Sequence, residues 1–277
     1  MADEHDVPKG GADRKVLIEV CDLWKSYEDL EVLKGINLKV KKGETIVILG
    51  RSGAGKSVLL RQIIGIEFPD KGHVEIDGKN LSTLSEKKRA AVTKHMGMLF
   101  QGAALFDSLN INENTAFYLR QHERYLSEKD IQSRVDEALT MVGLDGTQQK
   151  MPADLSGGMR KRAALARLIV YRPEIVLYDE PTTGLDPITA MSINTLINRT
   201  QEELQSTSIV VTHDIPSALE VGDRLAFHHD GIIIHIAPKK EFLTIDDPIL
   251  TSFFHFAQIS KEIMPGHAHK ESRSNHV

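Results

Sequence analysis

Cysteine is almost absent from this sequence, since Cys21 is the only one among its 277 residues. A disulfide within the chain is therefore excluded, which is typical of a protein from a reducing compartment. Apolar runs are also short, and none approaches the roughly 18 consecutive residues that predict a membrane-spanning helix. The N-terminal stretch MADEHDVPKGGADRK lacks the apolar core of a secretory signal. If the protein works at a membrane, we expect another protein to hold it there.

Neither sign of charge dominates, because 34 lysines and arginines face 39 aspartates and glutamates, for a net charge of -5. This balance does not predict broad binding to nucleic acid. Hydrophobic residues make up 41% of the chain and charged residues 26%, as in ordinary globular proteins of a size that can bury a core.

Strands and helices alternate along most of the chain, which predicts an α/β fold. Apolar runs bounded by turn residues predict strands at 16–27, 32–40, 44–50, 73–78, 96–101, 175–179, 208–213, 224–229 and 232–237. Helices are predicted at 56–65, 85–94 and 248–261, and between the later strands. Residues 108–154 are charged and helical in period, so they predict a helical insertion. Residues 1–14 and the tail from Met264 are polar and predict disorder.

The segment GRSGAGKS, residues 50–57, has the spacing G-x-x-x-x-G-K-[ST] of a phosphate-binding loop. Its glycines let backbone N–H groups turn toward a phosphate, Lys56 adds a point charge, and Ser57 offers a hydroxyl to Mg²⁺. The segment follows a predicted strand and opens a predicted helix, whose N-terminus also favours an anion. We therefore predict that this loop binds the phosphates of ATP.

The apolar strand IVLYD ends in Asp179, and Glu180 follows directly. A carboxylate at the end of a buried strand beside a phosphate loop is suited to hold Mg²⁺, directly or through water. Glu180 is placed to accept a proton from the attacking water. The pair therefore predicts hydrolysis in addition to binding.

A second anion site is predicted where LSGGM, residues 155–159, opens another helix. Ser156 is a good N-cap, and the two following glycines expose backbone N–H groups at the helix start. One chain thus carries two helix ends that favour phosphate.

These motifs, in this order and spacing, resemble those of the ATP-binding-cassette (ABC) ATPases over about residues 16–245. The resemblance implies an α/β ABC-type P-loop NTPase with a RecA-like core, an antiparallel β subdomain and a helical subdomain. The ATPase domain is then expected at 15–247, with its helical subdomain at about 106–160, followed by a C-terminal helix and flexible tail at 248–277.

The resemblance also implies a role for each motif residue. Nucleotide-binding roles fall on Tyr27, Gly50, Arg51, Ser52, Gly53, Ala54, Gly55, Lys56, Ser57 and Val58, with Tyr27 stacking on adenine. Catalytic roles fall on Lys56, Glu180 and His213, metal-binding roles on Ser57, Gln101 and Asp179, a signature role on Ser156, Gly157, Gly158 and Met159, and a D-loop role on Asp186. The implied cofactors are ATP and Mg²⁺.

In this family the signature of one subunit completes the ATP site of a second copy, in a head-to-tail dimer. The resemblance therefore implies that Ser156, Gly157 and Gly158 contact ATP bound by a partner copy. A single cassette without a spanning segment also implies separate transmembrane permease subunits.

Finer features resemble the Mla-type ATPases of Gram-negative bacteria, which drive phospholipid transport to maintain outer-membrane asymmetry. These features are Val58, the run LFQGAALFDSLNINEN around Gln101, and Met159 within LSGGMRKRAALARLI. They imply an MCE-domain protein and a small STAS-domain protein as further partners, at the cytoplasmic face of the bacterial inner membrane.

Three alternatives stay open at this point. The first is an ABC importer subunit for a small polar solute such as an amino acid. The second is a soluble, non-transport ABC ATPase, which would usually carry two cassettes or long insertions. The third is a regulatory module that does not hydrolyse ATP, against which Lys56, Asp179, Glu180 and His213 argue.

Overall fold

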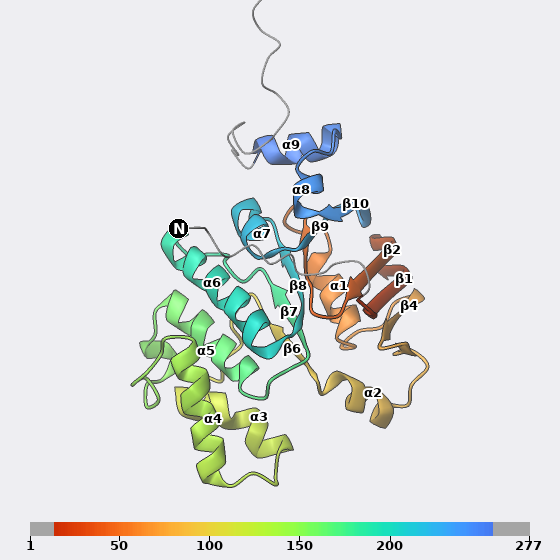
Figure 1. Ribbon diagram of the computed structural model, residues 1–277. Helices are drawn as coiled ribbons and strands as arrows, with labels where there is room; N and C mark the ends of the chain where they lie inside the picture. Colours follow the sequence, from red (N-terminus) through yellow and green to blue (C-terminus); the bar gives the residue numbers. More distant parts are fainter. Residues whose placement is uncertain (1–13, 257–277) are drawn as a thin grey trace, which may run out of the picture.

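The computed structural model describes residues 14–256, and within this range the strands form two sheets (Figure 1). The larger sheet has six strands in the order β10 (Ile232–Pro238), β9 (Arg224–His229), β3 (Thr45–Leu49), β8 (Thr207–Thr212), β7 (Ile175–Asp179) and β6 (Met96–Leu99). All neighbours in it are parallel except β10 and β9, which are antiparallel. The predicted α/β class is therefore confirmed.

The central strands are apolar because both faces of the sheet are covered. Every residue of β3, β7 and β8 is buried, as is usual for parallel strands between two layers. Ile46 and Ile48 of β3 face one hydrophobic cluster, while Val47 and Leu49 face the other. Alternate side chains of one strand thus hold both layers together.

One layer contains helix α1 (Lys56–Ile63) and the smaller antiparallel sheet (Figure 1). This sheet has the order β2 (Leu30–Lys41), β1 (Val16–Tyr27), β4 (Lys71–Ile76) and β5 (Lys79–Asn80). Its inner face packs with Leu59, Leu60 and Ile63 of α1 in one cluster. The short helix α2 (Glu86–Thr93) has no buried residue and precedes β6.

The other layer consists of helices from the second half of the chain, which pack in the second cluster. They are α5 (Gly157–Ile169), α6 (Pro187–Leu204) and α7 (Ile215–Val221), followed by α8 (Lys239–Phe242) and α9 (Pro248–Phe256). In the part of the chain that the structure describes, no helix is long and apolar enough to cross a membrane.

The predicted helical insertion contains α3 (Ile111–His122) and α4 (Glu128–Met141), which pack with α5 at one end of the molecule (Figure 1). Each of the two helices begins with a reciprocal capping box, Asn110 with Glu113 and Ser127 with Asp130. These caps satisfy N–H groups that the first helical turn leaves free. The apolar residues of α4 are buried against α5, so the charged residues of α4 lie on its solvent-exposed side.

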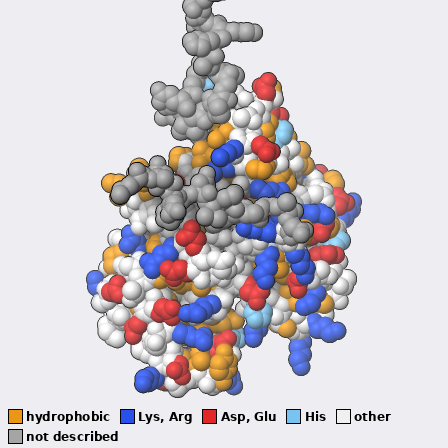
Figure 2. Space-filling model, viewed as in Figure 1, with side chains coloured by type: hydrophobic (Ala, Val, Ile, Leu, Met, Phe, Trp, Pro, Cys, Tyr) orange, Lys and Arg blue, Asp and Glu red, His pale blue; other side chains and the backbone are white. Residues whose placement is uncertain are grey.

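Each predicted strand is present, with ends displaced by a few residues, and the predicted helix at 56–65 ends at Ile63. The short strand β5 was not predicted. Residues 1–13 and 257–277 lie outside the described residues, so the expected disorder of both ends and the second part of the 248–261 helix are not described. On the face in Figure 2, basic and acidic side chains are interspersed, in keeping with the small net charge.

Candidate active site

The phosphate loop, residues 50–57, joins buried strand β3 to helix α1. Gly55 has a φ of +96°, and a Cβ atom there would lie 2.7 Å from Cγ1 of Val32. A Cβ atom at Gly50 would lie 2.5 Å from the carbonyl oxygen of His228 in β9. Only glycine fits at these two positions, so the sequence motif is required by the neighbouring strands as well as by phosphate.

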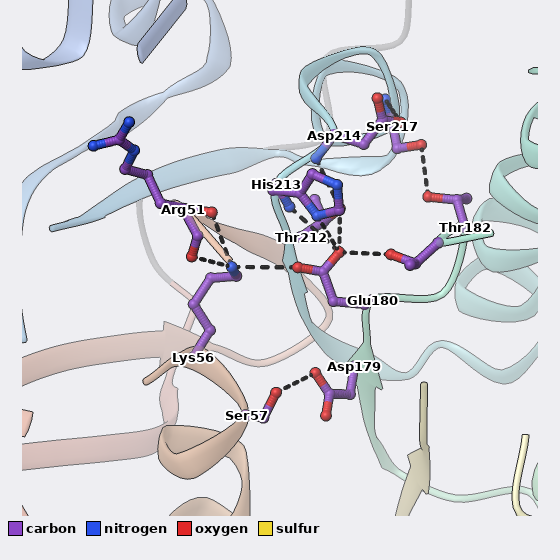
Figure 3. Close-up of polar contacts among 12 residues, drawn as sticks. Arg51, Lys56, Ser57, Asp179, Glu180, Thr182, Thr212, His213, Asp214 and Ser217 are labelled. Atoms are coloured by element: carbon purple, nitrogen blue, oxygen red, sulfur yellow. Dashed lines mark hydrogen bonds and ion pairs between the residues drawn. The ribbon is translucent and has the colours of Figure 1, made fainter. Parts of the chain in front are cut away.

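Lys56, the first residue of α1, is only 5% exposed, and its ammonium is held on three sides (Figure 3). Nζ donates to the carbonyl oxygens of Gly50 at 2.8 Å and Arg51 at 2.9 Å. It also lies 3.2 Å from Oε1 of Glu180. The loop therefore holds a buried positive charge at its own mouth, where it can interact with phosphate oxygens.

Asp179 ends β7 and faces the start of α1, where its Oδ1 accepts a hydrogen bond of 2.7 Å from Ser57 Oγ (Figure 3). Burial raises the pKa of Asp179, although the Ser57 hydroxyl and the charge of Lys56 act against it. A buried carboxylate beside a hydroxyl is the oxygen donor set that Mg²⁺ prefers. The residues present thus fit the predicted metal.

Glu180 is the most connected side chain of the site. Its Oε2 accepts from Nδ1 of His213 at 2.9 Å, from Oγ1 of Thr183 at 3.0 Å and from Oγ1 of Thr212 at 3.2 Å. Burial alone would raise the pKa of Glu180, but the charge of Lys56 and the hydrogen bond from His213 outweigh it and hold that pKa below its ordinary value. The carboxylate is therefore ionised and held in place, as a proton acceptor requires.

Glu180 also has a left-handed backbone, with a φ of +47°. Such conformations in residues other than glycine cost energy and cluster at functional sites.

A cavity of about 340 Å³ opens over these residues and brings most of the predicted site together. It is lined by Tyr27, Val32, Ser52, Gly53, Gly55, Lys56, Ser57, Val58, Gln101, Glu180, Thr183 and His213. Tyr27 is 40% exposed at this cavity, and its phenol donates to the carboxylate of Glu67. Arg51 instead lines a different cavity, between the phosphate loop and α9.

The predicted signature residues do not line this cavity. Ser156 is exposed and caps α5, where its Oγ accepts from the N–H of Met159 at 3.3 Å. Asp186 caps the neighbouring helix α6 by accepting from the N–H of Thr189 at 3.0 Å, and its hydrogen bonds to Thr189 lower its pKa. A Cβ atom on Gly158 would lie 2.5 Å from Cγ2 of Thr189. The signature and Asp186 thus form a second group of residues.

Several side chains that contact the predicted site residues belong to no sequence motif and were not predicted. Thr212, Thr183 and Glu67 hold predicted residues in place, yet their residue types occur throughout the chain. Lys161, whose Nζ donates to the backbone carbonyl of Gln101, is a different case, since it lies within the distinctive stretch that begins at the signature. That stretch was the feature of the sequence that could have indicated a role for Lys161.

The buried histidine of β9, His228, gives the protein a testable acid sensitivity. It is 0% exposed, neither ring nitrogen has a hydrogen-bond partner among the described residues, and burial lowers its pKa to about 4. Protonation below the ordinary value of 6.5 then favours the unfolded chain. The stability contributed by neutral His228 is fully present above pH 6.5 and decreases as the pH falls toward 4, with a loss of about 2.5 kcal/mol near pH 4.5.

We expect His228→Leu to remove this part of the pH dependence. Urea unfolding near pH 7 and near pH 4.5 measures it, as the change in the stability difference between variant and wild type. Replacement of the exposed His95 by leucine should leave the wild-type pH dependence in place. An equal pH dependence in His228→Leu and wild type would contradict the expectation.

Comparison with known proteins agrees with the geometry. A family model described as ABC transporter matches residues 33–183. The chain is 39% identical over 244 residues to the probable ribonucleotide transport ATP-binding protein mkl of Mycobacterium tuberculosis, which covers 88% of this chain and 68% of that protein. It is 40% identical over 237 residues to the intermembrane phospholipid transport system ATP-binding protein MlaF of Haemophilus influenzae, covering 86% of this chain and 89% of that protein.

A relative named for sulfate/thiosulfate import, from Nocardia farcinica, is 39% identical over 225 residues, and one named for methionine import, from Clostridium tetani, is 40% identical over 210 residues; these matches cover 81% and 76% of this chain. Among solved structures, a dimeric ATP-binding cassette in a post-hydrolysis state, bound to ADP and Pi, has a TM-score of 0.75 and 32% identity. That match covers 80% of this chain and 99% of the cassette.

The family match spans more than half of the chain and includes the phosphate loop, Gln101, the signature and the acidic pair. The relatives and the solved cassette extend the likeness over most of the remaining sequence. The predicted family and ATPase activity are therefore confirmed: this chain belongs to the ABC transporter family as an ATP-binding subunit that hydrolyses ATP.

Proposed function

We propose that this ATPase drives the transport of phospholipid between the inner and outer membranes of a Gram-negative bacterium, where it maintains outer-membrane lipid asymmetry. The observation that carries the proposal is the 40% identity to the phospholipid transport ATP-binding protein of H. influenzae, which extends over 89% of that protein. In this proposal the subunit lies at the cytoplasmic face of the inner membrane, held by transmembrane permease subunits. An MCE-domain protein and a STAS-domain protein complete the assembly.

Within the site, each side chain has a role that its contacts support. The phosphate loop and Lys56 bind the phosphates, and Tyr27 stacks on adenine at the cavity rim. Ser57, Asp179 and Gln101 would hold Mg²⁺, which neutralises developing charge on the phosphates when bound. Glu180 accepts the proton of the attacking water, and His213, 2.9 Å from it, orients the carboxylate and contacts the γ-phosphate.

The second group of residues, around Ser156 and Asp186, serves the ATP of another copy in this proposal. Its exposure and its absence from the lining of the chain's own cavity support this arrangement. So does the dimeric state of the related cassette. ATP then closes the dimer because it binds the closed form more tightly, and hydrolysis reopens it.

A bulky residue at Ser156 tests this arrangement. We expect Ser156→Trp to bind ATP in its own cavity but to lose the occlusion of radiolabelled ATP, because the indole ring blocks the approach of the partner. The matched control is Ser127→Trp, since Ser127 also caps a helix and both variants lose a cap worth about 1 kcal/mol. Undiminished occlusion by Ser156→Trp would refute the contact in trans.

The proteins that co-purify with this chain from membranes distinguish between the candidate cargoes. We expect the tagged chain to retain a permease together with an MCE-domain and a STAS-domain protein. Because relatives named for import reach the same percentage identity over shorter stretches of this chain, a polar-solute importer is the second candidate. A permease accompanied by a binding protein for a small solute would favour the importer, and ribosomes or DNA without a permease would favour a non-transport ATPase.

A further inference from the structure

Helix α5 carries a buried lysine for which the proposed function has no role. Lys161 is 6% exposed. Its Nζ donates to the backbone carbonyl of Gln101 and lies 3.4 Å from the backbone carbonyl of Glu180. Within residues 14–256, no carboxylate forms a salt bridge with it. The contacts of this ammonium are therefore with two backbone positions of the catalytic site.

The position of Lys161 along α5 connects two parts of the molecule. Ser156 caps the start of this helix, and Lys161 follows about one turn later. Gln101 lies just after β6 and Glu180 just after β7, which are neighbouring parallel strands. One side chain thus joins the signature end of α5 to the ends of two strands that carry predicted catalytic residues.

The energetics of the site argue that stability is not the reason for a lysine here. Burial lowers the pKa of Lys161, while the charges of Asp179 and Glu180 act to raise it. Burying a cation without a paired carboxylate is costly, and replacing buried charges by apolar groups of similar volume is often neutral or stabilising. A methionine would fill the same space without a buried charge but would leave the carbonyl oxygens of Gln101 and Glu180 without this donor. These two effects oppose each other, so stability alone does not explain the lysine, which points to function.

A second cation of α5 holds the next part of the same loop. Arg167 donates to the backbone carbonyl of Ala104 and stacks on the ring of Phe106, with 4.2 Å between the guanidinium carbon and the ring centre. Ala103 and Ala104 both have left-handed backbones, with φ of +66° and +51°. Such a conformation is unfavourable for alanine and persists only where the surroundings impose it. These contacts hold the loop after Gln101 against α5, so we expect the loop to move with this helix.

We infer that Lys161 is a positioning residue that couples the two ATP sites of the dimer through α5. The coupling rests on the proposed contact of Ser156 with the partner's ATP. When that contact moves the start of α5, Lys161 transmits the movement to Gln101 and Glu180, which act on the chain's own ATP. Closure at one site thereby sets the geometry of catalysis at the other.

The test is the variant Lys161→Met in the full-length chain, compared with Lys161→Gln, which keeps an uncharged donor. For Lys161→Met we expect kcat to fall about tenfold, as for a small misplacement of catalytic groups. The Hill coefficient for ATP should fall toward one, while the Kd for ATP and the thermal midpoint stay at wild-type values or the midpoint rises. Lys161→Gln should recover part of both kcat and the Hill coefficient.

Arg162→Met is the matched control, because Arg162 is the next residue of α5 and donates instead to Ser192 of α6 at 2.8 Å. It should keep the wild-type kcat and Hill coefficient. A wild-type Hill coefficient in Lys161→Met would overturn the inference, as would an activity loss explained by a lower thermal midpoint. Two other measurements show whether the proposed dimer itself is wrong. In that case the wild type would have a Hill coefficient of one, and Glu180→Gln would form no dimer with ATP. That result would overturn the coupling as well.

Discussion

Glu180→Gln should bind ATP, accumulate as a closed dimer and lose nearly all turnover. The amide keeps the size of the carboxylate but cannot take a proton from water, and loss of a general base typically costs a factor of about 10² to 10⁴. It also removes the negative charge that lies 3.2 Å from Nζ of Lys56. Steady-state phosphate release measures the loss, and gel filtration with ATP and Mg²⁺ measures the dimer.

The chain offers a close control in Glu44, another buried glutamate. It is 5% exposed and pairs with Arg224 at 3.0 Å, at the opposite end of β3 from the phosphate loop. Glu44→Gln should therefore be less stable but should hydrolyse ATP normally. Normal steady-state turnover by Glu180→Gln would show that Glu180 is not the base.

Lys56→Ala should lose ATP binding or turnover, and we expect kcat/KM to fall by about 10² or more, as when a preorganised charge is removed from a transition state. The lost ammonium bridges two carbonyl groups of the phosphate loop and Glu180, so its removal takes away both the charge for phosphate and the counter-charge of the base. Calorimetric titration with ATP separates the loss of binding from the loss of chemistry.

Lys239→Ala is the control for removal of a lysine that donates to a carbonyl group. Lys239 donates to the carbonyl oxygen of Leu219 at 2.7 Å and has no contact with the cavity. It should retain ATP binding and turnover. If Lys56→Ala turned over ATP at the wild-type rate while folded, the assigned role of Lys56 would be wrong.

The chemistry of the phosphate loop was predictable from sequence because its determinants are local. Glycines, one lysine and one hydroxyl at fixed spacing define a turn whose backbone groups face one ligand, whatever surrounds it. The all-buried strands β3 and β7 were predictable for a similar reason, since only strands covered on both faces are so uniformly apolar. Capping residues such as Ser156 are likewise read from their immediate neighbours.

What the sequence could not supply depends on residues that the fold brings together from distant positions. The parallel pairing of β8 with β7 places His213, just after β8, beside Glu180, just after β7, and Thr212 reaches the same carboxylate from 32 residues away. Lys161 meets Gln101 across 60 residues. The distinctive stretch that begins at the signature includes Lys161, but a lysine on an amphipathic helix normally faces solvent, so the sequence did not indicate that this side chain is buried.

By itself, therefore, the sequence determined that this protein binds and hydrolyses ATP, because a phosphate loop, an acidic strand end and a signature are short motifs with local physical causes. Only the tertiary structure decided how these parts are connected. It left the signature outside the chain's own cavity and placed Lys161 between α5 and two strand ends. Packing sets such contacts, since a side chain's partners across the core depend on the path of the whole chain and not on its neighbours in sequence.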